Sequence, residues 1–423
     1  MDPHSSRRDF AKASAFSALG TFGLGSLALD GDAARAAERP TDQPQDVPSA
    51  ANLGTLFEEV RQLAGDGEYP FSFLNERFTS FRAFQSEARA QVLDAFAYRP
   101  APVEPRAEVL ERVDLGDYVR EKILFSTSPV FRVPAYVLIP KGLKGRAPAI
   151  VDLHSHGGMF LFGKEKITDL GDNLPTMTAY HARNYEGRPT ATALVKRGYV
   201  VIAIDALMFG ERRALLAADA KYGWDRAKYS ADDVKYINDK CRAREPTIVK
   251  GLTLAGLTWP GIVTWDDMRT IDYLVTRPEV DPERIGCLGV SFGGHRSLFL
   301  GGLDDRIRAA CVTGFMSTVR PMIERHLDTH SFVHFVPHLH RRMDLPDVAA
   351  LRAPLPLMVQ QCTQDQLFPL AGMQAALDKM AAIYRKAGAA ERFVGKFYEV
   401  PHTLNIAMQD DAFAFFDKHL KRA

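Results

Sequence analysis

Cysteine is scarce in this sequence. The 423 residues contain four cysteines, and no two of them have the C-x-x-C spacing of zinc or redox sites. Those that lie in apolar, strand-like runs are expected to be buried free thiols. An excess of charge of one sign is also lacking, because 53 basic and 52 acidic residues leave a formal net charge of +1. Since a balanced chain has no electrostatic footprint for nucleic acid or an anionic membrane surface, we expect no nucleic-acid partner. We also expect no metal, because the cysteines lack metal-type spacing.

A long hydrophobic run is lacking as well. The apolar stretch at residues 13–29 is at or below the length that spans a bilayer, and no second such stretch follows. This stretch lies after an Arg-Arg pair at 7–8 and before a small-residue pattern, A-R-A, at 34–36. The order is typical of a twin-arginine signal peptide covering residues 1–36, although an amphipathic helix is the alternative. We expect a periplasmic or secreted mature protein with no membrane anchor.

Three regions are expected after the signal. Residues 37–50 are polar and rich in proline without periodicity, which is typical of a linker. Residues 51–106 are mostly compatible with helix, and we expect them to form a short helical extension. Within that extension the stretch 81–96 predicts one amphipathic helix, because it has apolar residues at helical spacing: Ala88, Val92, Leu93 and Phe96. Residues 107–423 are expected to form the main domain.

Apolar runs characterise this main domain. The segments 119–127 and 131–141 alternate in polarity across a short turn, which predicts an antiparallel strand pair. Later runs are continuously apolar, as in strands buried on both faces, at 147–155, 199–206, 284–291, 306–314, 355–363 and 392–400. Because helical stretches alternate with these runs, we predict an α/β fold with a mainly parallel central sheet and helices on both faces.

The candidate nucleophile is Ser291. It is the centre of the G-x-S-x-G pattern at 289–293, directly after a predicted buried strand and before a stretch that can start a helix. A sharp strand-to-helix turn leaves room only for small residues beside the serine and projects its hydroxyl at the carboxyl edge of the sheet. A plain strand end with a glycine turn is the alternative, so the chain must also supply a base and an acid.

A candidate acid and a candidate base follow Ser291, in the order serine, acid, histidine that is expected with a nucleophile turn of this kind. His402 comes directly after the last predicted strand, and Asp365 comes directly after the strand before it. A serine hydroxyl needs a general base, and that base needs an orienting carboxylate. Asp304 and Asp305 precede a strand, so they are expected at the opposite edge of the sheet, and His419 is expected on a late helix. We therefore predict a triad of Ser291, Asp365 and His402.

Two backbone amides are needed to stabilise the oxyanion. One is expected from Phe292, the residue after the nucleophile, at the amino end of a helix. The other is expected from the loop His156-Gly157-Gly158, where glycine lets the backbone approach a substrate carbonyl. Either Gly157 or Gly158 is predicted to supply this second donor.

The segments "HSHGG", "GVSFGGH", "QDQLFP" and "VPHT" make the resemblance specific. From about residue 107 to its end the chain resembles the α/β-hydrolase superfamily, and within it the exported hydrolases similar to dienelactone hydrolases and acetyl xylan esterases. The resemblance implies hydrolysis of a small-molecule or carbohydrate ester by a Ser-Asp-His triad, with no cofactor.

A histidine-rich segment lies between the predicted strands at 306–314 and 355–363. Residues four apart share one face of a helix and could bind a metal, but Pro337 interrupts any helix here, and no acidic residue or cysteine completes a site. In this fold the region often forms a pocket wall, so His330 and His334 are candidates for substrate binding, with packing as the alternative. The full set is His326, His330, His334, His338 and His340.

Further polar positions have both a functional and a structural interpretation. His156 is a candidate for substrate binding because it adjoins the glycine loop. Glu211 follows a predicted strand end and can reach the pocket rim, or it belongs to a solvated ion-pair cluster. Asp266 and Asp267 are expected in the first turn of a helix, where the helix dipole favours acidic residues.

Two other functions are compatible with such a fold. One is a peptidase related to the prolyl oligopeptidases. Those enzymes are similar to one another in having a large β-propeller, and the roughly 70 residues before the hydrolase-like region are too few to build one. The other is a non-catalytic binding protein, which a complete triad disfavours. The acyl group, the alcohol and the oligomeric state are not determined by the sequence.

Overall fold

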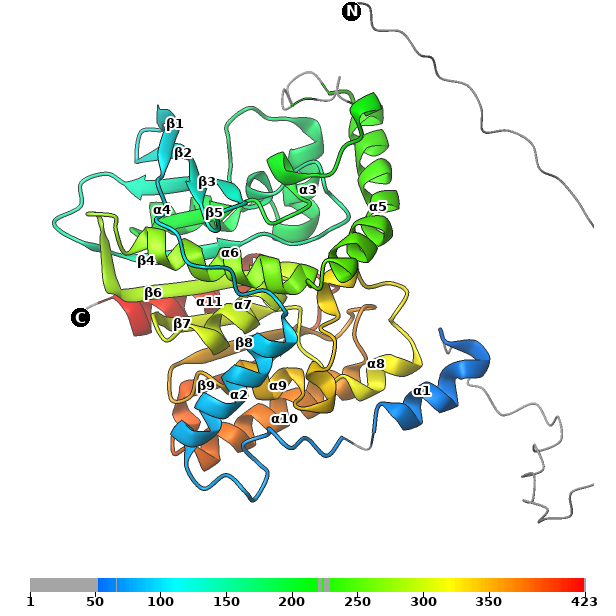
Figure 1. The fold of residues 1–423 in the computed structure, drawn as a ribbon. Helices are drawn as coiled ribbons and strands as arrows, with labels where there is room; N and C mark the ends of the chain where they lie inside the picture. Colours follow the sequence, from blue (N-terminus) through cyan, green and yellow to red (C-terminus); the bar gives the residue numbers. More distant parts are fainter. Residues whose placement is uncertain (1–51, 66, 220–222, 224–228, 422–423) are drawn as a thin grey trace, which may run out of the picture. The chain divides into compact units, whose positions relative to one another are not determined.

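The computed structural model describes residues 52–65, 67–219, 223 and 229–421 (Figure 1). The predicted signal peptide, residues 1–36, and the predicted linker, residues 37–50, lie outside the described residues. No helix of the described part is long and apolar enough to cross a membrane.

A nine-stranded sheet of order β1-β2-β3-β5-β4-β6-β7-β8-β9 organises the described residues. The first three strands pair antiparallel with their neighbours, and the six strands from β5 to β9 in this order run parallel. The predicted antiparallel pair and the six later strands are therefore confirmed. Burial on both faces is wrong for the last of them, because β9 lies at the edge of the sheet and none of its residues is buried. The strands are β1 Glu108–Asp114, β2 Tyr118–Ser126, β3 Arg132–Pro140, β4 Ala147–Leu153, β5 Val200–Ile204, β6 Val280–Val290, β7 Ile307–Thr313, β8 Leu357–Cys362 and β9 Phe393–Tyr398.

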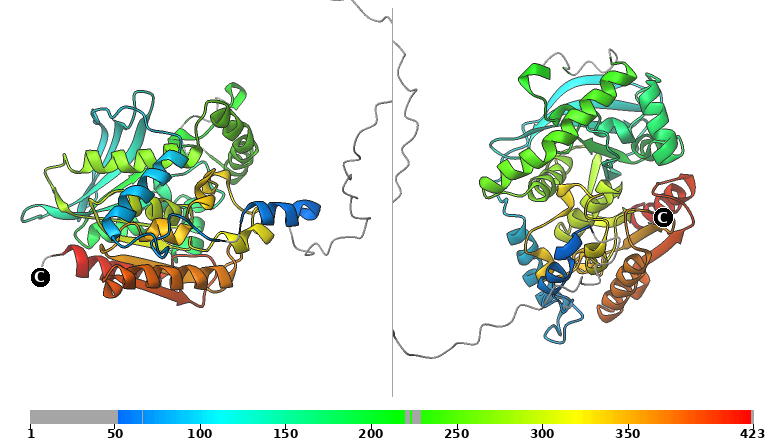
Figure 2. Two further views of the ribbon diagram at one scale, coloured as in Figure 1. Left: turned by 60° about the horizontal axis from the view of Figure 1, so that its bottom comes forward. Right: turned by 90° about the vertical axis from the view of Figure 1, so that its right-hand side faces the viewer.

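Helices cover both faces of the sheet, as predicted. One apolar cluster contains residues of α2, α6, α7, α9 and α10, and a second contains residues of α3, α4, α5 and α11. Figure 2 (right) shows α2 in blue and α11 in red on opposite sides of the strands. The bounds are α1 Phe57–Leu63, α2 Phe81–Ala95, α3 Pro175–Tyr185, α4 Thr190–Lys196, α5 Ala231–Leu254, α6 Trp259–Leu274, α7 Phe292–Leu303, α8 Arg320–Glu324, α9 Leu345–Ala350, α10 Leu370–Lys386 and α11 Ile406–Leu420.

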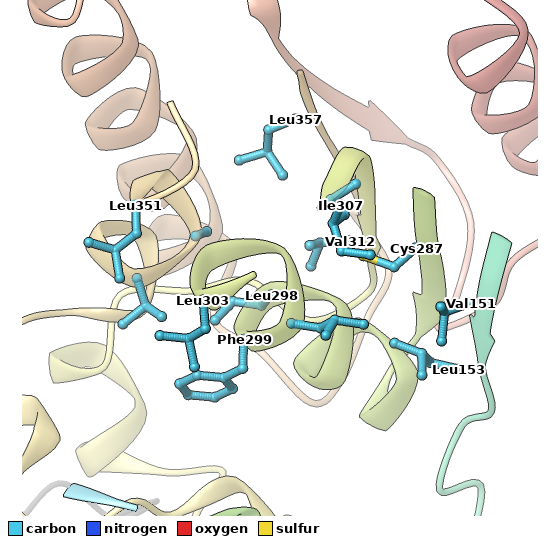
Figure 3. Packing of buried hydrophobic residues seen from close by; sticks show 14 of the residues in the cluster. Val151, Leu153, Cys287, Leu298, Phe299, Leu303, Ile307, Val312, Leu351 and Leu357 are labelled. Carbon is cyan, nitrogen blue, oxygen red and sulfur yellow. The ribbon is translucent and has the colours of Figure 1, made fainter. Parts of the chain in front are cut away.

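The two clusters follow from the alternation of side chains along each central strand. In β4, Val151 and Leu153 belong to the first cluster, whereas Ile150 belongs to the second. Figure 3 shows Val151 and Leu153 beside Cys287 of β6 and the apolar side chains of α7. All four cysteines are free and buried. The continuous apolar runs in the sequence are thus explained by burial on both faces.

Helix α2 forms where the spacing of apolar residues predicted it. Ala88 and Val92 are fully buried, and the ring of Phe96 lies 5.0 Å from that of Phe299 in α7. Ser80 caps the helix by accepting a hydrogen bond from the Ala83 amide. This helix of the predicted extension therefore packs directly on the helix that follows Ser291.

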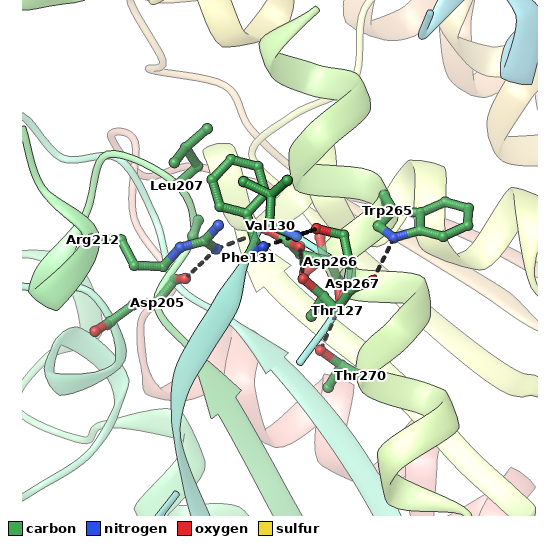
Figure 4. A network of polar contacts seen from close by, with 12 residues as sticks. Thr127, Val130, Phe131, Asp205, Leu207, Arg212, Trp265, Asp266, Asp267 and Thr270 are labelled. Atoms are coloured by element: carbon green, nitrogen blue, oxygen red, sulfur yellow. Dashed lines mark hydrogen bonds and ion pairs between the residues drawn. The ribbon is translucent and has the colours of Figure 1, made fainter. Parts of the chain in front are cut away.

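The expectation for Asp266 and Asp267 is wrong. Helix α6 begins at Trp259, capped by Thr258, so both carboxylates lie in its middle and are fully buried. Asp267 pairs with Arg296 at 2.6 Å. In Figure 4, Asp266 accepts hydrogen bonds from Thr127 and Arg212. Each carboxylate is compensated by a cation, which is how a fold accommodates buried charge.

The amino end of α7 crosses the carboxyl end of β4 at very short range. A Cβ atom added to Gly293 would overlap the carbonyl oxygen of Leu153, the last residue of β4. Glycine is required there because backbone, not a movable side chain, occupies the space. This crossing sets the position of the residue before α7, Ser291.

We expect Gly293→Ala to lower the free energy of unfolding by about 3 kcal/mol, because α7 must move away from β4. Gly251→Ala is the matched control, since Gly251 lies within α5 and has no atom within 4 Å of an added Cβ. That control should be neutral or stabilising by roughly 0.5–1 kcal/mol. Urea denaturation measures both, and equal stabilities would contradict the close crossing.

Candidate active site

Ser291 occupies a strained turn between β6 and α7. Its backbone has φ 60° and ψ −121°, a conformation that residues other than glycine rarely adopt. The turn is held from both sides, because the Ser291 amide donates to the Thr313 carbonyl at 2.9 Å and the Ser291 carbonyl accepts from the His295 amide at 2.9 Å. Ser291 lines a cavity of about 450 Å³.

His402 and Asp365 meet at the rim of the same cavity. Nδ1 of His402 lies 2.6 Å from Oδ2 of Asp365, whose other oxygen accepts from the Leu367 amide at 2.8 Å. The Asp365 side chain is almost fully buried, whereas that of His402 is 24% exposed. His402 lines the cavity together with Ser291, and its Nε2 has no hydrogen-bond partner among the described residues. The carboxyl ends of β6, β8 and β9 thus bring the three predicted residues to one edge.

The acidic residues expected at the opposite edge are engaged there. Asp304 pairs with Arg306, and Asp305 pairs with Arg89, just before β7 begins. His419 lies on α11 with its ring 4.7 Å from that of Phe415. None of these residues lines the cavity.

The predicted glycine loop forms another wall of the cavity. Gly157 and Gly158 have φ values of 55° and 67°, and the Met159 amide donates to the His156 carbonyl at 3.1 Å. Two consecutive positive φ values are characteristic of a type I′ turn, which strongly favours glycine. The Gly158 amide donates to Nδ1 of His156 at 3.1 Å.

Phe292 begins α7, and its ring is fully buried. It packs among the rings of Phe209, His154 and His156, with the Phe209 centroid 5.5 Å away. As the first residue of a helix its amide has no partner within that helix. The position agrees with the expected oxyanion donor.

His156 faces a carboxylate that the sequence reasoning missed. Its Nε2 lies 3.8 Å from Oε2 of Glu245, and burial lowers the pKa of this imidazole. Glu245 also accepts from the Ser331 hydroxyl at 2.8 Å and the Phe332 amide at 2.9 Å. Burial raises the pKa of Glu245, but the nearby His156 and these hydrogen bonds outweigh it and leave the pKa below its usual value. No sequence signal marked Glu245, because its helix α5 has no clear amphipathic pattern.

His330 and His334 line the cavity as packed imidazoles. His334 lies 4.7 Å from the Phe315 ring and 4.9 Å from the His295 ring, and His330 lies 4.9 Å from the Phe368 ring. Burial lowers the pKa of both, so they are neutral at ordinary pH. Each keeps one ring nitrogen without a partner among the described residues, Nε2 of His330 and Nδ1 of His334.

The histidine-rich segment is not a helix. His326 and His338 have φ values of 88° and 66°, and only short 3₁₀ turns form at Phe332–His334 and Leu339–Arg341. The expected helical stacking of the whole set therefore does not form, although the rings of His330 and His334 lie 5.6 Å apart. Within the described part of the chain no group of three histidine, cysteine or acidic side chains could hold a metal.

Glu211 lies outside the cavity, which corrects its assignment to substrate binding. Its carboxylate pairs with Lys164 at 2.7 Å and with Lys122 at 3.0 Å. It is absent from the cavity lining. The alternative, an ion-pair cluster, is what forms, but it is largely withdrawn from solvent, because the turn after β5 directs this side chain toward the buried Lys164 and the half-buried Lys122. Lining residues that the sequence did not single out include Ser155, Asn184, Arg242, Glu245 and Phe315.

Comparisons with known proteins agree with this geometry. The model of a family described as "Abhydrolase family" matches residues 57–399. The chain belongs to this family. It has the α/β-hydrolase fold that the motifs predicted.

Similar proteins were found by sequence and by structure. The Bacillus subtilis (strain 168) protein "Putative hydrolase YtaP" is 26% identical over 337 residues, which are 79% of this chain and 100% of that protein. A structure described as a "putative acetyl xylan esterase" from Bacteroides fragilis has a TM-score of 0.60 and 21% identity, covering 81% of this chain and 82% of its own. A glucuronoyl esterase from Solibacter usitatus has a TM-score of 0.54 and 14% identity, covering 82% and 93% respectively. At these identities the two structures establish a shared fold.

We expect Ser291→Gly to be more stable than Ser291→Ala by about 1 kcal/mol, because glycine removes the strain of the positive φ angle. Both variants lose the hydroxyl, so they differ only in the Cβ atom at this turn. Thermal and urea denaturation measure the difference. If Ser291→Ala is the more stable variant, the turn is not strained.

Proposed function

We propose that this protein is an exported serine hydrolase that cleaves carboxylic esters through an acyl-enzyme, with Ser291, Asp365 and His402 as the catalytic triad. The observation that supports the proposal most is the 2.6 Å contact between Asp365 and His402 at the rim of the cavity that Ser291 lines. The strained turn at Ser291 supports it independently, because such strain is concentrated at functional sites.

The reaction has two halves. Ser291 Oγ attacks the ester carbonyl carbon while His402 Nε2 takes the hydroxyl proton, and the carbonyl π electrons move to oxygen. The C–O bond to the alcohol then breaks, and His402 gives its proton to the leaving oxygen, which leaves an acyl group on Ser291. Water attacks this acyl carbon with His402 again as base, and the acid and free Ser291 are released. Asp365 accepts the Nδ1 hydrogen bond, which orients His402 and stabilises the imidazolium.

The oxyanion of each tetrahedral intermediate would be held by backbone amides. One donor is the Phe292 amide at the start of α7, where the helix dipole also favours negative charge. The second comes from the loop at His156, Gly157 and Gly158. Gly157 is the better candidate of the two glycines, because the Gly158 amide already donates to His156.

The lining of the cavity supports a hydroxyl-rich substrate such as an acetylated carbohydrate. Asn184, His330 and His334 offer neutral polar groups, and Arg242 and Glu245 offer charged ones. Neutral imidazoles with an unpaired nitrogen can bind sugar hydroxyls and also pack against the apolar face of a sugar ring. The similar folds of an acetyl xylan esterase and a glucuronoyl esterase support the same substrate class.

We also propose the organisation of the whole chain. Residues 1–36 act as a twin-arginine signal, 37–50 as a linker, 51–106 as a helical extension and 107–423 as the catalytic domain. Burial of α2 against the helix that follows Ser291 supports a structural role for the extension.

We expect a fluorophosphonate to label the purified mature protein at Ser291, and the protein to hydrolyse p-nitrophenyl acetate. Ser291→Ala is the control and should show neither labelling nor hydrolysis. Acetylated xylo-oligosaccharides should be cleaved with a higher kcat/KM than long-chain or aromatic esters. Absence of both labelling and hydrolysis would contradict the hydrolase proposal and favour a binding protein with the same fold.

We expect Asp365→Asn to lower kcat by roughly three to four orders of magnitude, because His402 loses the carboxylate that orients it and stabilises its charge. Asp305→Asn is the matched control, because it makes the same change at the opposite edge of the sheet. Steady-state hydrolysis of p-nitrophenyl acetate measures both. Near-full activity of Asp365→Asn would mean that another group is the triad acid.

A further inference from the structure

Lys166 is a buried lysine that contacts the predicted oxyanion loop. It lies in the 3₁₀ turn Lys164–Ile167 and has no exposed surface. Its Nζ donates to the Ser155 carbonyl at 2.8 Å and to the His156 carbonyl at 3.0 Å. The ring of Phe209 lies 4.4 Å from the same nitrogen.

Lys164, two residues earlier in the sequence, differs from Lys166 in its ion pairs. Lys164 pairs with Asp205 at 2.7 Å, Glu165 at 3.1 Å and Glu211 at 2.7 Å, so its charge is balanced by carboxylates. Lys166 makes no such ion pair within the part of the chain that the structure describes. Its hydrogen bonds go to the loop, and burial lowers its pKa well below the ordinary value. Lys166 therefore contributes hydrogen bonds to two carbonyl groups of the loop and no ion pair to a described carboxylate.

The directions of the two carbonyls determine the directions of the amides that follow them, because each peptide bond is planar. In a trans peptide the carbonyl of one residue and the N–H of the next point in opposite directions. The Ser155 carbonyl shares a plane with the His156 amide, and the His156 carbonyl shares a plane with the Gly157 amide. Because both carbonyls point at Lys166, the amides of His156 and Gly157 point away from it.

Other contacts fix the same two planes. Nδ1 of His154 lies 3.0 Å from the Ser155 carbonyl, while Nε2 of His154 accepts from the Ala206 amide at 3.2 Å, so Nδ1 carries the proton and donates. The Met159 amide donates to the His156 carbonyl. Each carbonyl therefore receives a second donor besides Lys166.

Ser155, His156 and Gly157 line the cavity together with Ser291, and Lys166 does not. The loop therefore lies between Lys166 and the cavity, and amides that point away from Lys166 are assigned to the cavity side. We propose that Lys166 is a positioning residue for the oxyanion site: it holds the Ser155 and His156 carbonyls so that the His156 and Gly157 amides face the substrate carbonyl oxygen. The inference rests on the proposed function and extends it, because it adds the His156 amide as a donor and gives both amides a cause for their direction.

Loss of the amine should affect the transition state more than the substrate complex. Without Lys166 each carbonyl keeps a single donor, so the two peptide planes are held less firmly and the amides converge less closely on the oxygen that becomes charged. Removing one oxyanion donor costs roughly 10²–10³ in kcat in enzymes of this kind, so a disturbance of two donors should cost at least about 10².

The test is Lys166→Met, which keeps the length and apolar stem of the side chain and removes the amine. We expect kcat for p-nitrophenyl acetate to fall at least about 100-fold, with KM changed less than about threefold. The Ki of a boronic acid that forms a tetrahedral adduct on Ser291 should rise by a similar factor. The matched control is Lys379→Met, which removes the amine that pairs with Asp347 outside the cavity lining and should leave kcat unchanged.

Two results would overturn the proposal. One is a folded Lys166→Met protein whose kcat and boronic-acid Ki stay within twofold of wild type, whatever its melting temperature. The other needs no variant: in a crystal structure of the wild-type phosphonate adduct, the oxyanion-mimicking oxygen should lie within hydrogen-bond distance of the His156 or Gly157 nitrogen, and its absence from both would contradict the assignment. A wild-type protein that neither hydrolyses esters nor reacts with the phosphonate would instead overturn the proposed function.

Discussion

The close crossing of α7 over the carboxyl end of β4 is the constraint on which the candidate site depends. Gly293 brings the helix backbone against the Leu153 carbonyl, so β4, β6 and α7 can share one narrow region. The residue before the helix, Ser291, has a positive φ angle. The loop after β4 begins at the same point. The close contact at Gly293 therefore places the proposed nucleophile beside the start of the proposed oxyanion loop.

Parallel strand pairing extends this constraint to the rest of the site. Asp365 and His402 follow β8 and β9, which run in the same direction as β6, so their loops emerge at the same edge. The pairing explains why three residues separated by 74 and 37 positions in the sequence approach one cavity. The side chains then need only short loops to meet.

The sequence predicted the parts of the molecule that local physics determines. Buried parallel strands give continuous apolar runs, and the glycines around Ser291 report a crowded turn, so both were found. Strand β1 was missed because it lies exposed at the edge of the sheet and carries no apolar pattern. The start of α6 was misplaced, because a buried aspartate in mid-helix is acceptable only when a distant arginine such as Arg296 pairs with it. Glu211 was wrongly assigned to the cavity and Glu245 was missed for the same reason, because the contacts of both depend on partners that only the fold brings together.

The imidazoles at the cavity differ in what they contact, and this difference separates proton traffic from substrate recognition. His402 touches a buried carboxylate, whereas His330 and His334 rest on aromatic rings and backbone. In the proposed reaction a proton taken from the serine hydroxyl is thus directed to one ring, although several similar rings lie nearby. Under that proposal the other histidines can be substituted, and substrate preference can change, without creating a competing base.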